Sequence, residues 1–131
     1  MDRQEAIVCV DDEVIILMAL KMELGRYYKG RFRIETARNA EEALEVIEEL
    51  HAEDVGVRVV LTDWLMPGMK GDRFISMVKE KHPDTRCILV SGQEDVGAPE
   101  GTEADSLADG FIRKPWLSSQ LIEAVDRCIG P

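Results

Sequence analysis

Short apolar segments alternate with longer helical patterns along the whole of this 131-residue chain. The third short segment, Val57–Thr62, is apolar almost throughout, which is typical of a strand buried on both faces of a sheet. Strands that alternate with helices predict a parallel sheet covered on both faces, with right-handed crossovers. We therefore expect residues 1–131 to form one α/β domain of five strand-helix units, without a linker or an internal repeat.

The predicted elements follow from the apolar periods and from the residues that cap or break helices. The expected strands are Ala6–Val10, Phe32–Ala37, Val57–Thr62, Cys87–Val90 and Gly110–Ile112. The expected helices are Val14–Tyr28, a helix from an N-cap at Asn39 to Ala52, Asp72–Lys81, and a helix from a cap at Ser118 or Ser119 to about Cys128. In the first helix the apolar positions are Ile15, Met18, Leu20, Met22 and Leu24.

Composition excludes several classes of function. The chain is 45% hydrophobic and 32% charged, as globular proteins are, and its formal net charge is −10. That charge argues against nucleic acid or an anionic membrane as the direct partner. The polar N-terminus shows no signal peptide and no apolar run long enough to span a membrane, so we expect a cytoplasmic protein.

The cysteines and histidines have no spacing typical of a metal site. The three cysteines, Cys9, Cys87 and Cys128, are scattered, which predicts core thiols in a reducing compartment. His51 and His82 stand near predicted helix ends, and we interpret both as surface histidines.

Reactive side chains stand where four of the predicted strands end. Asp11 and Asp12 follow the first strand, Asp63 ends the third, Ser91 follows the fourth and Lys114 follows the fifth. Each has an ordinary structural explanation alone, such as a helix cap, a turn or a surface lysine. In a parallel sheet, however, these strand ends meet at one edge, where such folds bind ligands. The coincidence of all of them at one edge favours a functional site.

Three clustered carboxylates repel one another unless a cation neutralises them, and oxygen ligands suit a hard divalent cation such as Mg²⁺. Beside such a metal, Asp63 could attack phosphorus and form an aspartyl-phosphate. Lys114 and Ser91 could then hold the other phosphoryl oxygens through an ammonium and a hydroxyl. Pro67 and the glycines after it shape the loop that lines this cleft.

Four motifs in this order resemble the receiver domain of bacterial response regulators. They are VDDE at residues 10–13, TDWLMPGMKG at 62–71, VSG at 90–92 and FIRKPW at 111–116. The resemblance covers essentially the whole chain, and it is specific because all four motifs occur together. It implies a flavodoxin-like (βα)5 sheet with the strand order 2-1-3-4-5.

The resemblance also implies a role for each site residue. Asp63 is expected to be the phosphoacceptor for a phosphohistidine. Asp12 is the expected direct Mg²⁺ ligand, Asp11 is expected to act largely through water, and the backbone carbonyl of Leu65 is the third expected protein ligand. The remaining roles are those of a switch hydroxyl, a switch aromatic, a phosphoryl-binding lysine and a cis proline, and the matching residues are Ser91, Phe111, Lys114 and Pro115.

As a whole, the resemblance implies a phosphoacceptor module of a two-component system or phosphorelay rather than an enzyme. Phosphorylation of Asp63 would bias a two-state surface around the fourth helix, fifth strand and fifth helix. The expected partner is a sensor histidine kinase or a phosphotransfer protein, and a homodimer through that surface is a further hypothesis. No output domain is expected in this chain. Leu65 has no polar group to orient a water, which predicts slow self-dephosphorylation.

One region departs from the family pattern. Residues 92–110, GQEDVGAPEGTEADSLADG, carry Gly97, Pro99 and Gly101 in their interior, where a fourth helix is usual. We expect no helix over Asp95–Gly101 and a short one near Thr102–Ala108. The region is either a simple loop variant or a signalling face, over Glu94–Leu107, that is mobile or specialised for an unusual partner.

Two other classes of protein fit the sequence less well. A haloacid-dehalogenase-type phosphatase uses the same aspartyl-phosphate chemistry, but it needs an Asp-x-Asp pair on the first strand and a cap insertion. This chain has adjacent Asp11 and Asp12 and no insertion of that size. A degenerate receiver that works without phosphorylation normally loses an acidic residue or the lysine, and all of these are present here. No phosphate-binding P-loop occurs either.

Overall fold

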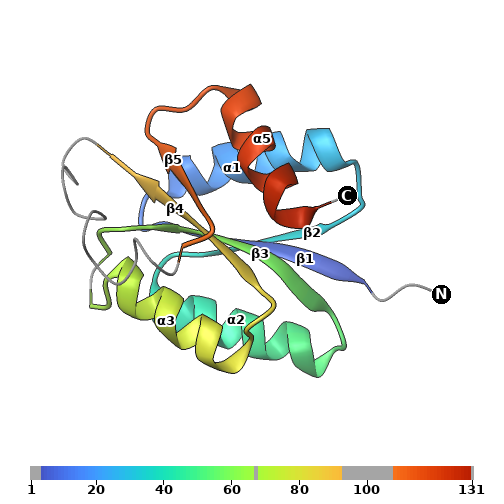
Figure 1. The fold of residues 1–131 in the computed structure, drawn as a ribbon, viewed down its shortest axis with the longest axis vertical. Coiled ribbons are helices and arrows are strands. Elements are labelled where there is room, and N and C mark those ends of the chain that lie inside the picture. Colours follow the sequence, from blue (N-terminus) through green and yellow to red (C-terminus); the bar gives the residue numbers. More distant parts are fainter. Residues whose placement is uncertain (1–3, 67, 93–107, 131) are drawn as a thin grey trace.

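The structure is a computed structural model that describes residues 4–66, 68–92 and 108–130. One five-stranded parallel sheet has the order β2-β1-β3-β4-β5, so the predicted flavodoxin-like sheet is confirmed (Figure 1). The strands are β1 (Glu5–Val10), β2 (Arg33–Ala37), β3 (Gly56–Asp63), β4 (Arg86–Ser91) and β5 (Gly110–Arg113). The helices are α1 (Val14–Tyr28), α2 (Ala40–Ala52), α3 (Gly71–Lys81) and α5 (Ser118–Ile129).

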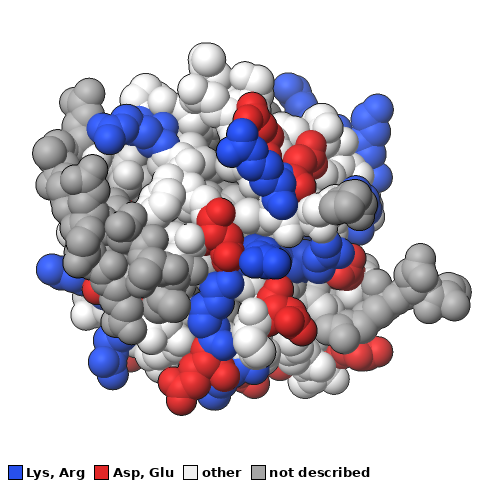
Figure 2. All heavy atoms as spheres, in the orientation of Figure 1, with Lys and Arg blue, Asp and Glu red and all other residues white. Residues whose placement is uncertain are grey.

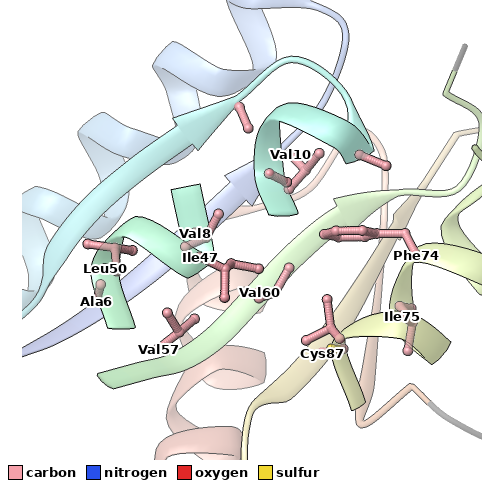
Figure 3. Close-up of a cluster of buried hydrophobic side chains, with 14 of the residues drawn as sticks. Ala6, Val8, Val10, Ile47, Leu50, Val57, Val60, Phe74, Ile75 and Cys87 are labelled. Carbon is pink, nitrogen blue, oxygen red and sulfur yellow. The ribbon is translucent and has the colours of Figure 1, made fainter. Parts of the chain in front are cut away.

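Helices cover both faces of the sheet. In Figure 1, α1 and α5 lie on one side of it and α2 and α3 on the other. Two clusters of buried apolar side chains match these two layers. Figure 3 shows the cluster beneath α2 and α3, where Ile47, Val60 and Phe74 meet between the helices and the sheet. Because both faces are covered, nearly every residue of β3 is buried, as its apolar run predicts.

The first helix differs from its predicted pattern. It buries Leu17, Leu20 and Leu24, whereas Ile15, Met18 and Met22 are exposed. Apolar residues therefore lie on more than one side of α1, and apolar character alone could not identify the side that packs on the sheet.

The predicted helix caps are partly right. The Asn39 side chain accepts a hydrogen bond from the Glu42 N–H at 2.8 Å and caps α2 as expected. The cap of α5 is Leu117 rather than Ser118 or Ser119. The Gln120 side chain accepts a hydrogen bond from the Leu117 N–H at 2.9 Å, which satisfies a backbone donor at the start of α5.

Two of the three cysteines are core thiols, as predicted, whereas Cys128 is only partly buried. Cys9 and Cys87 are buried, and burial raises the pKa of each thiol to about 12. Such thiols stay protonated and unreactive near neutral pH.

The interpretation of the histidines needs correction. The His51 and His82 rings stack on each other with centroids 4.0 Å apart, and both side chains are partly buried. The stack joins the end of α2 to the residue that caps α3, and neither helix end indicates the other in the sequence.

Two expectations lie outside the described residues. Residues 93–107 include Asp95–Gly101, where we expect no helix, and nearly all of Thr102–Ala108, where we expect a short one. The position of Pro67 is also outside them.

Candidate functional site

The carboxyl ends of the strands bring the three predicted aspartates together. Asp11 and Asp12 follow β1, and Asp63 is the last residue of β3. One oxygen from each carboxylate lies within 4.8 Å of the other two. The register places Val10 beside Thr62, so the ends of β1 and β3 are level with each other.

Lys114, directly after β5, reaches into the same cluster. Its Nζ lies 2.9 Å from Asp11 Oδ2 and 3.4 Å from Asp63 Oδ1, and its side chain is 13% exposed. Burial acts to lower the pKa of the Lys114 ammonium, but the hydrogen bond to Asp11 and the charge of Asp63 raise it above its usual value. Lys114 is therefore a permanent cation at this site.

The two adjacent aspartates have different surroundings. Asp11 is 1% exposed, and its Oδ1 accepts a hydrogen bond from the Glu13 N–H at 2.8 Å. Its own N–H donates to the Ala37 carbonyl at 3.1 Å, which fixes the loop to β2. Asp12 is exposed. The buried carboxylate is thus held by the protein, while the exposed one is open to solvent and to a ligand.

This donor set fits a hard divalent cation. Among the described residues, three carboxylates and one ammonium leave an excess of two negative charges within a few ångströms. Oxygen-only ligands with one exposed member match the preferences of Mg²⁺, which keeps several of its waters. Leu65, two residues beyond Asp63, has an exposed side chain, and its backbone carbonyl stays a prediction as a further ligand.

The loop after Asp63 folds back onto the strand end. The Gly71 N–H donates to the Trp64 carbonyl at 2.9 Å. A Cβ at residue 71 would lie 2.9 Å from the Asp63 carbonyl oxygen and 3.1 Å from Trp64 Cα, closer than side-chain carbons approach backbone. The start of α3 can therefore pack against the end of β3 only because residue 71 is glycine.

Ser91 and Lys114 are also brought together. The Lys114 N–H donates to the Ser91 carbonyl at 2.7 Å, and Ser91 pairs with Arg113 in the sheet. The peptide bond between Lys114 and Pro115 is cis. Phe111 lies on the edge strand β5 with its side chain 48% exposed.

The sequence does not predict a group of polar contacts made by the segment that follows Lys114. Glu23, on α1, accepts hydrogen bonds from Trp116 Nε1 at 3.2 Å and from Ser118 Oγ at 2.6 Å. The interacting residues are 93 and 95 positions apart in the chain. No local motif signals contacts of this range.

Comparison with known proteins identifies the family. A family model described as the response regulator receiver domain matches residues 7–126. The chain belongs to this family. It is a receiver domain of the two-component signalling type, and the family and fold inferred from its four motifs are confirmed.

Relatives of this receiver domain occur in larger proteins. It is 30% identical over 128 residues to the hydrogenase transcriptional regulatory protein HoxA of Cupriavidus necator. The match covers 98% of this chain and 25% of HoxA. It is 32% identical over 120 residues to the sensor kinase CckA of Brucella abortus. The match covers 91% of this chain and 12% of CckA. The receiver domain thus spans a quarter or less of these two curated relatives.

A solved structure shows the same fold. The response regulator protein TrrA of Thermotoga maritima, in complex with Mg²⁺ and beryllofluoride, superposes on this receiver domain with a TM-score of 0.78. The two are 27% identical, and the match covers 95% of this chain and 98% of TrrA.

Within the described ranges, no helix combines the length and apolar composition needed to cross a membrane.

Proposed function

We propose that Asp63 accepts a phosphoryl group from the phosphohistidine of a sensor histidine kinase or phosphotransfer protein. The observation that carries this proposal is the meeting of Asp11, Asp12 and Asp63 within 4.8 Å, with Lys114 Nζ 3.4 Å from Asp63 Oδ1. Receiver domains interact with proteins of these two kinds. A relative whose name is sensor kinase, CckA, supports the pairing with kinase chemistry.

The proposed reaction is an in-line transfer. One Asp63 carboxylate oxygen attacks the phosphorus, and a new P–O bond forms. The P–N bond to the donor imidazole breaks, and its electron pair leaves with the ring nitrogen, which takes a proton from the solvent. Asp63 suits this role because it ends a buried strand, so its carboxylate is fixed in place beside Lys114 and the other two carboxylates.

Asp11, Asp12, Asp63 and the Leu65 carbonyl would hold Mg²⁺, which would neutralise charge on the transferred phosphoryl oxygens. The Mg²⁺ and beryllofluoride in the TrrA complex support this assignment for a protein of the same fold. Lys114 supplies a second positive charge to those oxygens, and the Ser91 hydroxyl donates to another. Lys114 would then exchange a carboxylate partner for a phosphoryl oxygen.

The output follows from that exchange. When Lys114 and Ser91 turn toward the phosphoryl group, Phe111 would move from its exposed position toward the interior. The surface around β5 and α5 would then change shape. We propose that this surface binds the downstream partner, and that a homodimer forms through the same face.

The test uses Mg²⁺ with acetyl phosphate or beryllofluoride, followed by Trp64 fluorescence. Trp64 is buried next to the acceptor, so it reports on the site. We expect a metal-dependent change in wild type that is absent in Asp63→Asn, while the Trp116 background stays the same in both. A folded wild-type protein that binds Mg²⁺ but shows no change would favour a module that acts without phosphorylation.

A further inference from the structure

We infer that Glu23 is a positioning residue for Lys114: its carboxylate holds the segment after β5 so that the lysine reaches the acidic cluster. This inference rests on the proposed function, because Lys114 is the group that meets the phosphoryl oxygens. The contacts that carry it are the two hydrogen bonds that Glu23 accepts from Trp116 and Ser118, two and four residues beyond Lys114.

Between the bonds that hold Lys114 at one end and those that join Leu117 to α5 at the other, the segment from Lys114 to Ser118 has few other supports. A cavity of about 530 Å³ lies between it and α1, lined in part by Ile16, Ala19 and Pro115. Leu117 is 66% exposed, and Pro115 is exposed as well. Only the Trp116 ring packs against the apolar cluster under α1 and α5. Close packing therefore does not fix this segment, and polar bonds have a larger part in its position.

Glu23 itself lies on a helix that is held in place by its packing against the sheet. Its helix is anchored to the sheet by Leu20 and Leu24, which are buried on either side of it in the sequence. Farther along the helix, the Tyr28 hydroxyl donates to Asp126 of α5 at 2.6 Å. A half-buried carboxylate on such a helix gives Trp116 and Ser118 acceptors with a defined position.

The position of Lys114 affects two ligands in opposite ways. Its ammonium contacts Asp11 and Asp63, which are also the expected metal ligands, so it competes with Mg²⁺ for their charge. For a bound phosphoryl group the same ammonium is a partner. Loosening Lys114 should therefore weaken the binding of a phosphoryl mimic without weakening the binding of Mg²⁺, whereas general damage to the fold would weaken both.

Isothermal titration calorimetry tests this distinction. For Glu23→Ala we expect a beryllofluoride dissociation constant about tenfold higher at saturating Mg²⁺, as small misplacements of an active-site group produce. The Mg²⁺ dissociation constant should be unchanged or lower. Glu23→Gln, which keeps an acceptor oxygen, should recover most of the loss. Glu45→Ala removes an equal charge from an exposed position on α2 and should behave as wild type.

The double variant Glu23→Ala/Lys114→Ala decides whether Glu23 acts through the lysine. It should bind beryllofluoride no more weakly than Lys114→Ala alone, because the two residues contribute through one contact. Additive losses, an equal loss of Mg²⁺ and beryllofluoride affinity, or a Glu23→Gln variant as weak as Glu23→Ala would each overturn the inference.

Amide hydrogen exchange separates this inference from the proposed function, since it needs no ligand. The Lys114 N–H donates to the Ser91 carbonyl, and the Asp11 N–H donates to Ala37. In Glu23→Ala we expect faster exchange at Lys114 and unchanged exchange at Asp11. Unchanged exchange at Lys114 would overturn the positioning role. If wild type bound neither ligand, the proposed function would fail, and the exchange result would still decide whether Glu23 holds Lys114.

Discussion

At the amino end of the sheet, acidic and basic side chains form ion pairs, whereas at its carboxyl end acidic side chains outnumber basic ones in the described structure. At the amino end, Arg58 donates to the Glu5 carboxylate and to the Ile129 carbonyl. Asp109 accepts from Lys79 at 2.6 Å and from Arg86 at 3.2 Å. On the face shown in Figure 2, basic and acidic side chains are interspersed in this way.

At the carboxyl end the balance is different. Among the described residues there, Asp11, Asp12 and Asp63 lie together, and the Lys114 ammonium contacts Asp11 and Asp63. Both ends belong to the same sheet and the same set of strands, so the fold does not require this excess. The comparison indicates that the ion pairs at the amino end stabilise the fold, whereas the carboxyl end keeps a negative charge that a bound cation could neutralise.

The largest expected effect is that of Asp63→Asn. This change should abolish phosphoryl uptake, because the amide cannot act as the nucleophile. It should also raise the free energy of unfolding by about 1 kcal/mol in the absence of metal, since one of three repelling carboxylates is removed. Chemical denaturation with and without Mg²⁺ measures this. A loss of stability on removal of Asp63 would contradict the contrast between the two ends.

The amino end should respond in the opposite way to Asp109→Asn. Burial acts to raise the pKa of Asp109, but the Lys79 hydrogen bond and the Cys87 N–H hold it below its usual value of 3.8. We expect a loss of about 2 kcal/mol at pH 7, as for other hydrogen bonds between charged partners. Metal binding should not change.

The pH dependence of that loss has a definite sign. A carboxyl group whose pKa is lowered on folding contributes stability above its usual value of 3.8, and the contribution disappears as pH falls through the lowered value. The difference between wild type and Asp109→Asn should therefore shrink below about pH 4. Asp84→Asn, at an exposed position, is the matched control. A difference that stays constant down to pH 3 would show that charge is not its source.

Arg58→Met should have a smaller effect on stability. It leaves Glu5 and the Ile129 carbonyl without their donor, at a cost of about 1–2 kcal/mol, because the side chain is partly exposed. Thermal unfolding measures it. Arg58→Lys keeps the charge but not the forked geometry and should recover about half of the loss. A change in Mg²⁺ affinity would show that the two ends are coupled.

The smallest expected effect is that of Leu65→Asn. The Leu65 side chain is 40% exposed beside the acceptor and carries no polar group. An amide there could orient a water, and we expect a phosphoryl lifetime about threefold shorter, well below the effect of a positioned general base. Decay of the phosphorylated protein measures it, with Met22→Asn on α1 as the control. An unchanged lifetime would remove Leu65 from the account of slow self-dephosphorylation.

Most of the fold and the central site could be predicted because they depend on local sequence. Each strand of this sheet is a short apolar run, and a parallel sheet places the residues that follow such runs at one edge. Asp11, Asp12, Asp63 and Lys114 therefore meet as expected. The Asn39 cap was predictable for the same reason, because its partner is three residues away.

The features that were missed depend on contacts across the fold. Glu23 meets Trp116 and His51 meets His82 only after helices pack, and nothing near either residue indicates its partner. The Leu117 cap was missed because its hydrogen bond comes from the backbone of an apolar residue. The packed side of α1 was not identifiable either, because Ile15 and Met18 are as apolar as the leucines that are buried.

Gly71 has a consequence for how the sequence can vary. It carries no functional group, yet any side chain there would collide with the backbone of Asp63 and Trp64. Tolerance to substitution at this position should thus resemble that of Asp63 itself, and even alanine should fail. In a scan of all single substitutions, residue 71 should rank among the least tolerant positions, for a reason of space alone.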